Sequence, residues 1–282
     1  MMPRTKIEMP PALDLRVIAR QMKAAQDKVR QIEPFTSQWG DAFDVPSAYA
    51  VARLMHEARL AEGAVPVGRK LGFTNPAMWS RYGVGEPIWA YLYDTTVVHR
   101  LAKHSSCRLG LFTEPRIEPE IVFHFRSAPP THGDLPAILA CVDWVAHAFE
   151  IVQSHFPGWK FEAPDTVADS ALHGTLLVGE PRPVETLGAD LTEALERFSL
   201  TLSCDGEVRE VGRGSNVLGH PLAAVGHLLA LLARQPGAEP LRAGELVTTG
   251  TITAAPTVHP GQKWSTTLAG IDLPGLELEF VA

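Results

Sequence analysis

Hydrophobic residues recur at helical spacing in two segments near the N-terminus. Between residues 12 and 32, apolar side chains return every three or four positions, and Pro34 follows the segment. A similar stripe runs through residues 47–61, ahead of Gly63. The pattern predicts two amphipathic helices and a helical N-terminal portion over residues 1–65.

The rest of the chain shows short β-type runs separated by glycine and proline. The runs predicted as strands span residues 69–73, 90–98, 116–125, 174–179, 198–204, 246–253 and 263–268. Helical periodicity interrupts them at residues 137–153 and 221–234. The pattern predicts an α+β protein in which residues 66–282 form one β-rich unit with curled, largely antiparallel sheets.

Composition and charge indicate a globular protein and disfavour two classes of partner. Of the 282 residues, 45% are hydrophobic and 20% are charged, which argues against disorder. Twenty-five Lys and Arg against 32 Asp and Glu give a net charge of −7, without the basic tract that nucleic-acid binding needs. No window approaches the roughly 20 uninterrupted apolar residues that span a bilayer. We therefore expect neither nucleic acid nor a membrane as a partner.

The N-terminal residues and the cysteines indicate the cellular compartment. Charged residues are scattered through the first segment of the chain, which leaves no apolar region for a signal peptide. The three cysteines, Cys107, Cys141 and Cys204, are widely spaced and contain no C-x-x-C pair. Such a set argues against a disulfide framework or a zinc site. We expect a reducing, cytoplasmic compartment.

The most informative stretch for chemistry is the predicted strand at residues 116–125. Alternate side chains of a strand share a face, so Glu118 and Glu120 point the same way. Two adjacent carboxylates repel each other, and a divalent cation would relieve the repulsion, as would a solvated face. A third carboxylate, Glu150, lies among apolar residues near the end of a predicted helix. There it would bind the same cation, pair with a basic group or face water.

Seven short segments carry a family resemblance. They are GRKLGFT from residue 68, YLYD from 91, EPE from 118, FEIV from 149, DTVAD from 165, LGHPL from 218 and RAGELVTTG from 242. In order and approximate spacing they resemble the 2-keto-4-pentenoate hydratase and 4-oxalocrotonate decarboxylase family of the fumarylacetoacetate hydrolase superfamily. The resemblance covers most of the chain from about residue 49 onward.

The resemblance implies a fold, an oligomeric state and a set of site residues. The fold would be the mixed β roll of that superfamily, preceded by helices, in a homo-oligomer. Glu118, Glu120 and Glu150 match the three carboxylate ligands of a Mg²⁺ or Mn²⁺ ion. Lys70 matches the active-site lysine. Asp94 matches an aspartate near the metal and is a candidate base, although an ordinary turn residue is the alternative.

Further positions take roles only through the resemblance. His173 stands where many family members carry a small serine, so it would shuttle protons, bind a distal substrate group or serve as a hydrogen-bonded core histidine. Thr74, Leu92 and Thr251 are expected to bind substrate. Lys70 would act as acid or base if its pKa is lowered, or would stay charged and hold the substrate carboxylate, unless it is a solvated strand lysine.

The activity implied by the resemblance is hydration. A divalent ion chelated by an α-keto acid would stabilise an enolate, so that water adds to a 2-hydroxy-alka-2,4-dienoate and gives a 4-hydroxy-2-oxo acid, as in aromatic catabolism. Three alternatives stay open. They are decarboxylation of a 2-oxo-3-enedioate, hydrolysis of a C–C bond in an acylpyruvate, and a non-catalytic subunit that stabilises a partner enzyme.

Overall fold

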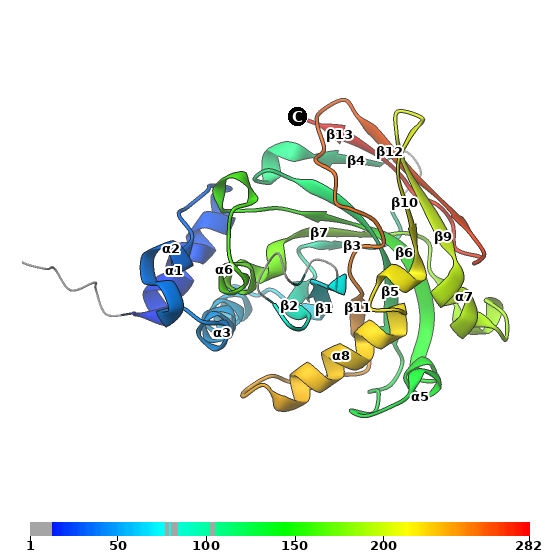
Figure 1. Cartoon of the computed structure of the whole chain (residues 1–282), viewed down its shortest axis with the longest axis horizontal. Coiled ribbons are helices and arrows are strands. Elements are labelled where there is room, and N and C mark those ends of the chain that lie inside the picture. Colours follow the sequence, from blue (N-terminus) through cyan, green and yellow to red (C-terminus); the bar gives the residue numbers. More distant parts are fainter. Residues whose placement is uncertain (1–12, 77–78, 80–83, 102–104) are drawn as a thin grey trace, which may run out of the picture.

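Figure 1 shows the computed structural model of the chain, which describes residues 13–76, 79, 84–101 and 105–282. The α-helices are α1 (Leu15–Asp27), α2 (Phe35–Trp39), α3 (Val45–Ala61), α5 (Leu135–Leu139), α6 (Ala163–Ala168), α7 (Leu191–Arg197) and α8 (Pro221–Arg234). The strands are β1 (Pro66–Gly72), β2 (Ile88–Tyr93), β3 (Val97–Val98), β4 (Ser105–Arg108), β5 (Arg116–Phe125), β6 (Val142–Val152), β7 (His173–Val178), β8 (Arg182–Pro183), β9 (Ser199–Cys204), β10 (Glu207–Arg213), β11 (Leu246–Thr248), β12 (Lys263–Ala269) and β13 (Glu277–Val281).

The larger sheet has eight strands and curls into a roll. Its order is β2-β1-β11-β5-β6-β7-β3, and β8 pairs with β6. The strands at the two ends, β2 and β3, are separated in the chain only by residues 94–96, so the sheet bends until its ends lie close together. Leu92, Val122, Ala148 and Leu176 share one buried cluster inside the roll. This architecture confirms the expected mixed α+β fold with a β roll.

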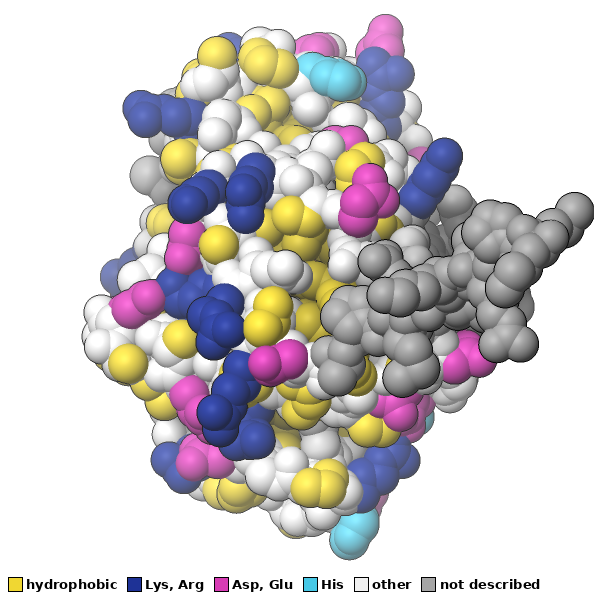
Figure 2. Space-filling model, turned by 90° about the vertical axis from the view of Figure 1, so that its left-hand side faces the viewer, with side chains coloured by type: hydrophobic (Ala, Val, Ile, Leu, Met, Phe, Trp, Pro, Cys, Tyr) yellow, Lys and Arg dark blue, Asp and Glu magenta, His cyan; other side chains and the backbone are white. Residues whose placement is uncertain are grey.

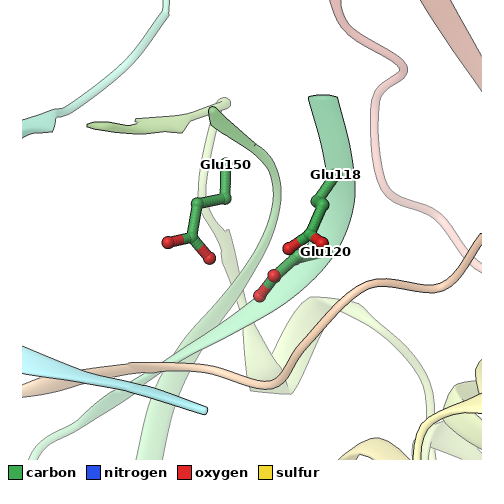
Figure 3. A group of neighbouring side chains, drawn as sticks. All are labelled: Glu118, Glu120 and Glu150. Atoms are coloured by element: carbon green, nitrogen blue, oxygen red, sulfur yellow. The ribbon is translucent and has the colours of Figure 1, made fainter. Parts of the chain in front are cut away.

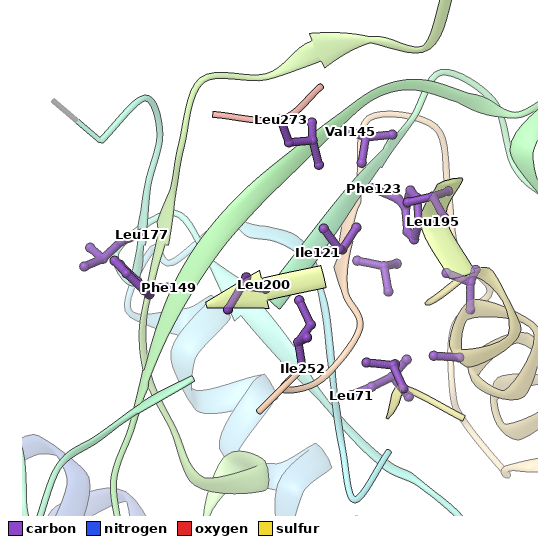
Figure 4. Packing of buried hydrophobic residues seen from close by; sticks show 14 of the residues in the cluster. Leu71, Ile121, Phe123, Val145, Phe149, Leu177, Leu195, Leu200, Ile252 and Leu273 are labelled. Carbon is purple, nitrogen blue, oxygen red and sulfur yellow. The ribbon is translucent and has the colours of Figure 1, made fainter. Parts of the chain in front are cut away.

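The outer face of strands β5 and β6 carries the main hydrophobic core. A five-stranded sheet of order β10-β9-β12-β13-β4 covers this face together with α8 (Figure 1). Ile121, Phe123 and Val145 point into the core between the two sheets (Figure 4). Alternation along β5 therefore buries Ile121 and Phe123 and leaves the inner face of the strand to Glu118 and Glu120.

Helix α8 begins and ends where the sequence pattern predicts. Pro221 occupies its first position, and Nδ1 of His220 accepts a hydrogen bond from the Leu222 N–H at 2.9 Å. Among the described residues, one helical stretch, Gly214–Arg234, is long and apolar enough to cross a membrane. Leu222 and Leu228 of this stretch are fully buried in the main core, so α8 is accounted for as a core helix.

The predicted N-terminal helices are present as α1 and α3, and they share a core with the roll. Ile18 and Met22 of α1 and Val51 of α3 pack in one cluster with Val167 of α6 and Ala90 of β2. Each of these side chains is buried because it faces another element rather than solvent. The helical portion therefore buries its apolar faces against the β-rich part of the chain.

Ion pairs join α1 to the end of α3. Lys23 Nζ lies 2.7 Å from Asp27 Oδ2 and 2.6 Å from Glu62 Oε1, and Arg59 lies 2.6 Å from Asp27 Oδ1. On the face of the molecule that carries these helices, basic side chains have acidic side chains beside them (Figure 2). Charges of both signs are therefore interspersed on this face.

The segment at residues 137–153 differs from the sequence-based expectation. The structure has only the short helix α5, followed by strand β6. A strand buried on both faces is apolar throughout, so its residues can match a helical stripe by chance. Here Phe149 faces the main core and Ala148 faces the inside of the roll. Glu150 therefore lies on a strand and not on a helix.

Candidate metal centre

Three carboxylates meet on the inner face of the roll. Glu118 is the register partner of Glu150 in the β5–β6 ladder, and Glu120 lies two residues further along β5 on the same face. Each carboxylate offers one oxygen, and these atoms all lie within 4.8 Å of one another (Figure 3). Glu120 and Glu150 are fully buried, whereas Glu118 is partly buried. Among the described residues this is the only such group of three potential metal ligands.

Two side chains contact the same carboxylate oxygen of Glu150. Lys70 Nζ lies 2.8 Å from Oε1 of Glu150, and His173 Nδ1 lies 2.7 Å from that atom. Lys70 is only 2% exposed, although it comes from β1, two strands away from β5. The other oxygen, Oε2 of Glu150, is buried and has no hydrogen-bond partner in the described part of the chain. One oxygen is thus held and the other is available to a ligand.

Glu120 is held in a similar way by the end of β11. The Thr248 hydroxyl and the Gly250 N–H both donate to Oε2 of Glu120, the latter at 2.8 Å. Oε1 of Glu120 is buried without a partner among the residues described. Gly250 has a φ of +94°, and a Cβ at this position would overlap the Thr74 hydroxyl. Only glycine therefore lets the backbone approach Glu120 this closely.

A buried histidine supports Glu120 through the main chain. His147 Nδ1 donates to the Glu120 carbonyl oxygen at 3.0 Å, because a carbonyl can only accept. Its Nε2 therefore accepts from the Thr266 hydroxyl at 2.8 Å, and the Thr266 oxygen accepts from the Leu276 N–H at 2.9 Å. Burial lowers the pKa of His147 to about 4, so the ring is neutral. The second sheet thereby holds β5 at Glu120.

Burial and mutual repulsion govern the protonation of the three glutamates. Burial raises the pKa of Glu118 to about 7, and burial together with the charges of Glu150 and Glu118 raises the pKa of Glu120 well above its usual value. Burial alone would also raise the pKa of Glu150, but Lys70 and the hydrogen bond from His173 outweigh it and lower this pKa to about 2. Burial disfavours the charge of Lys70, yet the three carboxylates raise its pKa overall. Lys70 therefore stays protonated.

The residues fit a hard divalent cation. Three ionised carboxylates and Lys70 carry −3 + 1 = −2 charges, which one divalent ion balances. Glu120 and Glu150 of this group each have one buried oxygen that lacks a hydrogen-bond partner among the described residues. Mg²⁺ and Mn²⁺ prefer such an all-oxygen donor set, and a bound cation would favour the ionised forms of Glu118 and Glu120. The site thus combines oxygen donors with an excess of negative charge that a divalent cation would neutralise.

The residues expected to bind substrate lie in different surroundings. Thr74 is buried next to Gly250, so it lies near the carboxylates. Leu92 is fully buried in the cluster inside the roll. The Thr251 hydroxyl donates to the Thr253 carbonyl oxygen at 3.0 Å and is partly exposed. Of the three, Thr74 and Thr251 adjoin the loop that holds Glu120.

Asp94 lies in an exposed turn at the end of β2. Its Oδ1 accepts a hydrogen bond from the Val65 N–H at 2.9 Å. No hydrogen bond joins Asp94 to the three glutamates in the described part of the chain, and its position fits the alternative of a turn residue.

Three side chains around the glutamates were not among the predicted site residues. Thr248, which bonds Glu120, lies within the RAGELVTTG segment. His147 lies in the segment predicted as a helix. The hydroxyl of Thr96 lies 2.9 Å from His173 Nε2. Their roles depend on pairing between strands distant in the sequence. No local pattern in the chain signals these contacts.

Comparisons with known proteins agree with the geometry. A 2-keto-4-pentenoate hydratase from Paraburkholderia xenovorans is 31% identical over 265 residues, which cover 93% of each chain. A 4-oxalocrotonate decarboxylase from Pseudomonas sp. is 34% identical over 221 residues, which cover 78% of this chain and 82% of that protein. The chain belongs to the 2-keto-4-pentenoate hydratase and 4-oxalocrotonate decarboxylase family. No protein-family model matches the sequence.

Solved structures share the fold of this family member. The 4-oxalocrotonate decarboxylase from Pseudomonas putida G7, complexed with magnesium and adipate, has a TM-score of 0.84 and 29% identity, and the match covers 95% of this chain and 97% of that one. A fumarylpyruvate hydrolase from Pseudomonas aeruginosa, in complex with Mn²⁺ and pyruvate, has a TM-score of 0.53 at 18% identity over 77% of this chain and 90% of its own. At that identity the second match shows the shared fold alone.

Proposed function

We propose that this family member is a hydratase that requires Mg²⁺ or Mn²⁺ and adds water to a 2-hydroxy-alka-2,4-dienoate, giving a 4-hydroxy-2-oxo acid. The observation that carries the proposal is the group of Glu118, Glu120 and Glu150 with Lys70 beside it and with buried oxygens that lack partners in the described part of the chain. Relatives named as hydratases support the reaction, among them a 2-hydroxyhexa-2,4-dienoate hydratase from Comamonas testosteroni, 31% identical over 245 residues.

The three glutamates would hold the cation, which supplies Lewis-acid stabilisation of the negative charge that develops on the 2-oxygen of the substrate. The dienoate must lose the proton of its 2-hydroxyl and gain one at C5, after which water adds at C4 and a proton adds at C3. Lys70 keeps its proton beside Glu150, so we assign to it the delivery of the proton at C5. Its ammonium would equally attract the carboxylate of a small α-keto acid.

The test follows the absorbance of 2-hydroxypenta-2,4-dienoate during incubation with purified protein and Mg²⁺. We expect the wild type and the exposed control Glu207→Gln to consume the dienol. Glu118→Gln should lose most activity because one cation ligand is neutralised, and EDTA should abolish turnover of the wild type. Wild-type consumption no faster than that of Glu118→Gln would refute hydration of this substrate.

Decarboxylation of a 2-oxo-3-enedioate is the second candidate. The structural similarity to the 4-oxalocrotonate decarboxylase from Pseudomonas putida G7, with a TM-score of 0.84, favours it. In addition, hydration and decarboxylation develop negative charge at the same oxygen of the substrate. Release of CO₂ from 2-oxohex-3-enedioate, without loss of the 2-hydroxypentadienoate absorbance, would identify the protein as a decarboxylase. Water addition without CO₂ release would identify the hydratase.

We also propose a cytoplasmic homo-oligomer. The three cysteines are all free thiols, as expected in a reducing compartment. Light scattering coupled to size-exclusion chromatography would measure the assembly, and a mass of 30.7 kDa would contradict the oligomer because it is the mass of one chain.

A further inference from the structure

His173 is the first residue of β7, and both of its ring nitrogens are engaged. Nδ1 lies 2.7 Å from Oε1 of Glu150, and Nε2 lies 2.9 Å from the Thr96 hydroxyl. An ionised carboxylate only accepts, so Nδ1 carries the hydrogen of the first bond. The ring thus joins one of the three glutamates to the connection between β2 and β3.

A carboxylate that binds a cation through one oxygen must present that oxygen in one direction. The amine of Lys70 meets Oε1 of Glu150 from the end of a flexible chain, whereas the His173 ring is rigid and is held at both nitrogens. Both neighbours use the same oxygen and leave Oε2 without a partner among the described residues. The ring and Lys70 together therefore determine which oxygen of Glu150 remains available.

The main chain before His173 has an uncommon conformation. Ser170, Ala171 and Leu172 have φ values of 52°, 52° and 64°. Residues other than glycine rarely adopt this left-handed region, and three in succession persist only where the surroundings enforce them. Here the Leu172 N–H donates to the Asp169 carbonyl oxygen at 2.8 Å. The backbone conformation specifies where β7 begins and hence where the imidazole lies.

Asp169 is fixed in turn by two other segments. His155 Nδ1 lies 2.8 Å from Oδ1 of Asp169, and Gln26 of α1 donates to the same oxygen at 3.1 Å. Gln26 also donates to the Ser170 hydroxyl at 3.1 Å. Asp169 and His155 are both at most 1% exposed. The N-terminal helical portion therefore contributes to the position of His173 through one buried carboxylate.

On its other side, His173 borders a groove of about 1090 Å³ between α3 and β2. Thr96 and Gly174 also line this groove. The described residues that form its lining include neither Lys70 nor any of the three glutamates. His173 thus stands between the groove and Glu150.

We propose that His173 is a positioning residue for cation binding. Its Nδ1–H, together with Lys70, fixes one oxygen of Glu150 so that the other faces the cation, and the left-handed segment at residues 170–172 sets the ring in place. The inference rests on the cation site of the proposed function. It gives His173 a role in metal affinity rather than in proton transfer.

The test measures Mn²⁺ binding to the full-length protein. Binding is monitored through the loss of the electron paramagnetic resonance signal of the free ion. Asparagine at position 173 places its amide nitrogen near the Nδ1 position, where it can still donate to Glu150. Glutamine places its amide nitrogen near the Nε2 position, toward Thr96. Residues that hydrogen-bond to a metal ligand typically contribute 10- to 100-fold in metal affinity. We therefore expect His173→Leu and His173→Gln to weaken Mn²⁺ binding by roughly that factor. His173→Asn should bind Mn²⁺ within about threefold of wild type.

Several results would overturn the positioning role. Unchanged Mn²⁺ affinity in His173→Leu and His173→Gln would do so, as would His173→Asn binding as weakly as His173→Gln. Circular dichroism in EDTA checks that the variants are folded, and if His173→Leu does not fold, the comparison of Asn with Gln decides. A purely structural role would change the melting temperature alike in the Asn and Gln variants without separating their Mn²⁺ affinities.

The Glu118→Gln variant separates this inference from the proposed function. Undiminished Mn²⁺ binding in Glu118→Gln would show that the ion lies elsewhere, so both claims would fail. Loss of binding in Glu118→Gln with normal binding in the His173 variants would overturn the positioning role alone.

Discussion

At the scale of single residues, the three glutamates differ in what their neighbours do. Glu150 is kept ionised by Lys70 and His173, whereas the pKa values of Glu118 and Glu120 are raised, first by burial. In the absence of a cation, protons therefore compete for two of the three ligands near neutral pH. The site should gain affinity for a divalent ion as the pH rises through about 7, because Glu118 then loses its proton.

Loss of the Lys70 amine should lower turnover without changing the fold. Lys70→Met keeps the length and apolar stem of the side chain but removes the proton donor beside Glu150. We expect turnover of the dienoate to fall by at least about 10²-fold, the lower range for a lost acid–base group, with an unchanged circular dichroism spectrum in Mg²⁺. Lys28→Met, at an exposed lysine, is the matched control. Turnover of Lys70→Met within a few-fold of wild type would exclude the assigned role.

At the scale of elements, the sequence predicted β5 and α8 with their observed bounds because each has a clear local signal. The alternation in β5 separates apolar from acidic faces, and α8 starts at a proline. Strand β6 was missed because it is apolar on both faces, and the edge strand β10, with Val208 and Val211 62% exposed, has too little apolar alternation to be recognised.

The candidate site, like the secondary structure, was predicted from the sequence only in part. The glutamates on β5 could be paired from strand alternation, but Glu150 and Lys70 were assigned only through the family resemblance. Their convergence depends on the register of β1, β11, β5 and β6, which joins residues far apart in the sequence. For the same reason the contacts of Thr248 and His147 with Glu120 could not be predicted.

His147 should make the contact between β6 and the second sheet sensitive to acid. Its pKa is about 4 in the folded protein and about 6.5 when unfolded, so the unfolded chain binds the proton first as the pH falls. The stability that the neutral ring contributes is complete above about pH 6.5 and is lost between there and pH 4, by up to roughly 3 kcal/mol.

Urea unfolding of the wild type and of His147→Gln, in EDTA at pH 7.5 and pH 5, measures this effect. The wild type should lose more free energy of unfolding between the two pH values than His147→Gln, because glutamine does not titrate. The same loss in both proteins would show that another group is responsible.

At the scale of the whole molecule, the N-terminal helices and the β-rich part share buried surface. The cluster that contains Ile18 and Val51 also contains Phe156, Val167 and Ala90. Hydrogen bonds from Gln26 to Asp169 and from Thr36 to Asp165 cross the same boundary. Among the described residues, the division at residue 65 thus separates two kinds of structure rather than two cores.

This shared core predicts cooperative unfolding. Scanning calorimetry of the full chain should show a single transition, because the helices cannot leave without exposing α6 and β2. An earlier, separate transition with the β signal of the circular dichroism spectrum retained would contradict it.

Above all, we propose the binding of the cation on which the reaction depends by Glu118, Glu120 and Glu150. Its most direct test is a crystal of the full-length protein grown with Mn²⁺ and oxalate, in which anomalous scattering locates the metal. We expect an anomalous peak bound by one oxygen from each glutamate, with oxalate completing the coordination. A crystal with no peak at these three carboxylates, or with a fully occupied peak elsewhere, would contradict it.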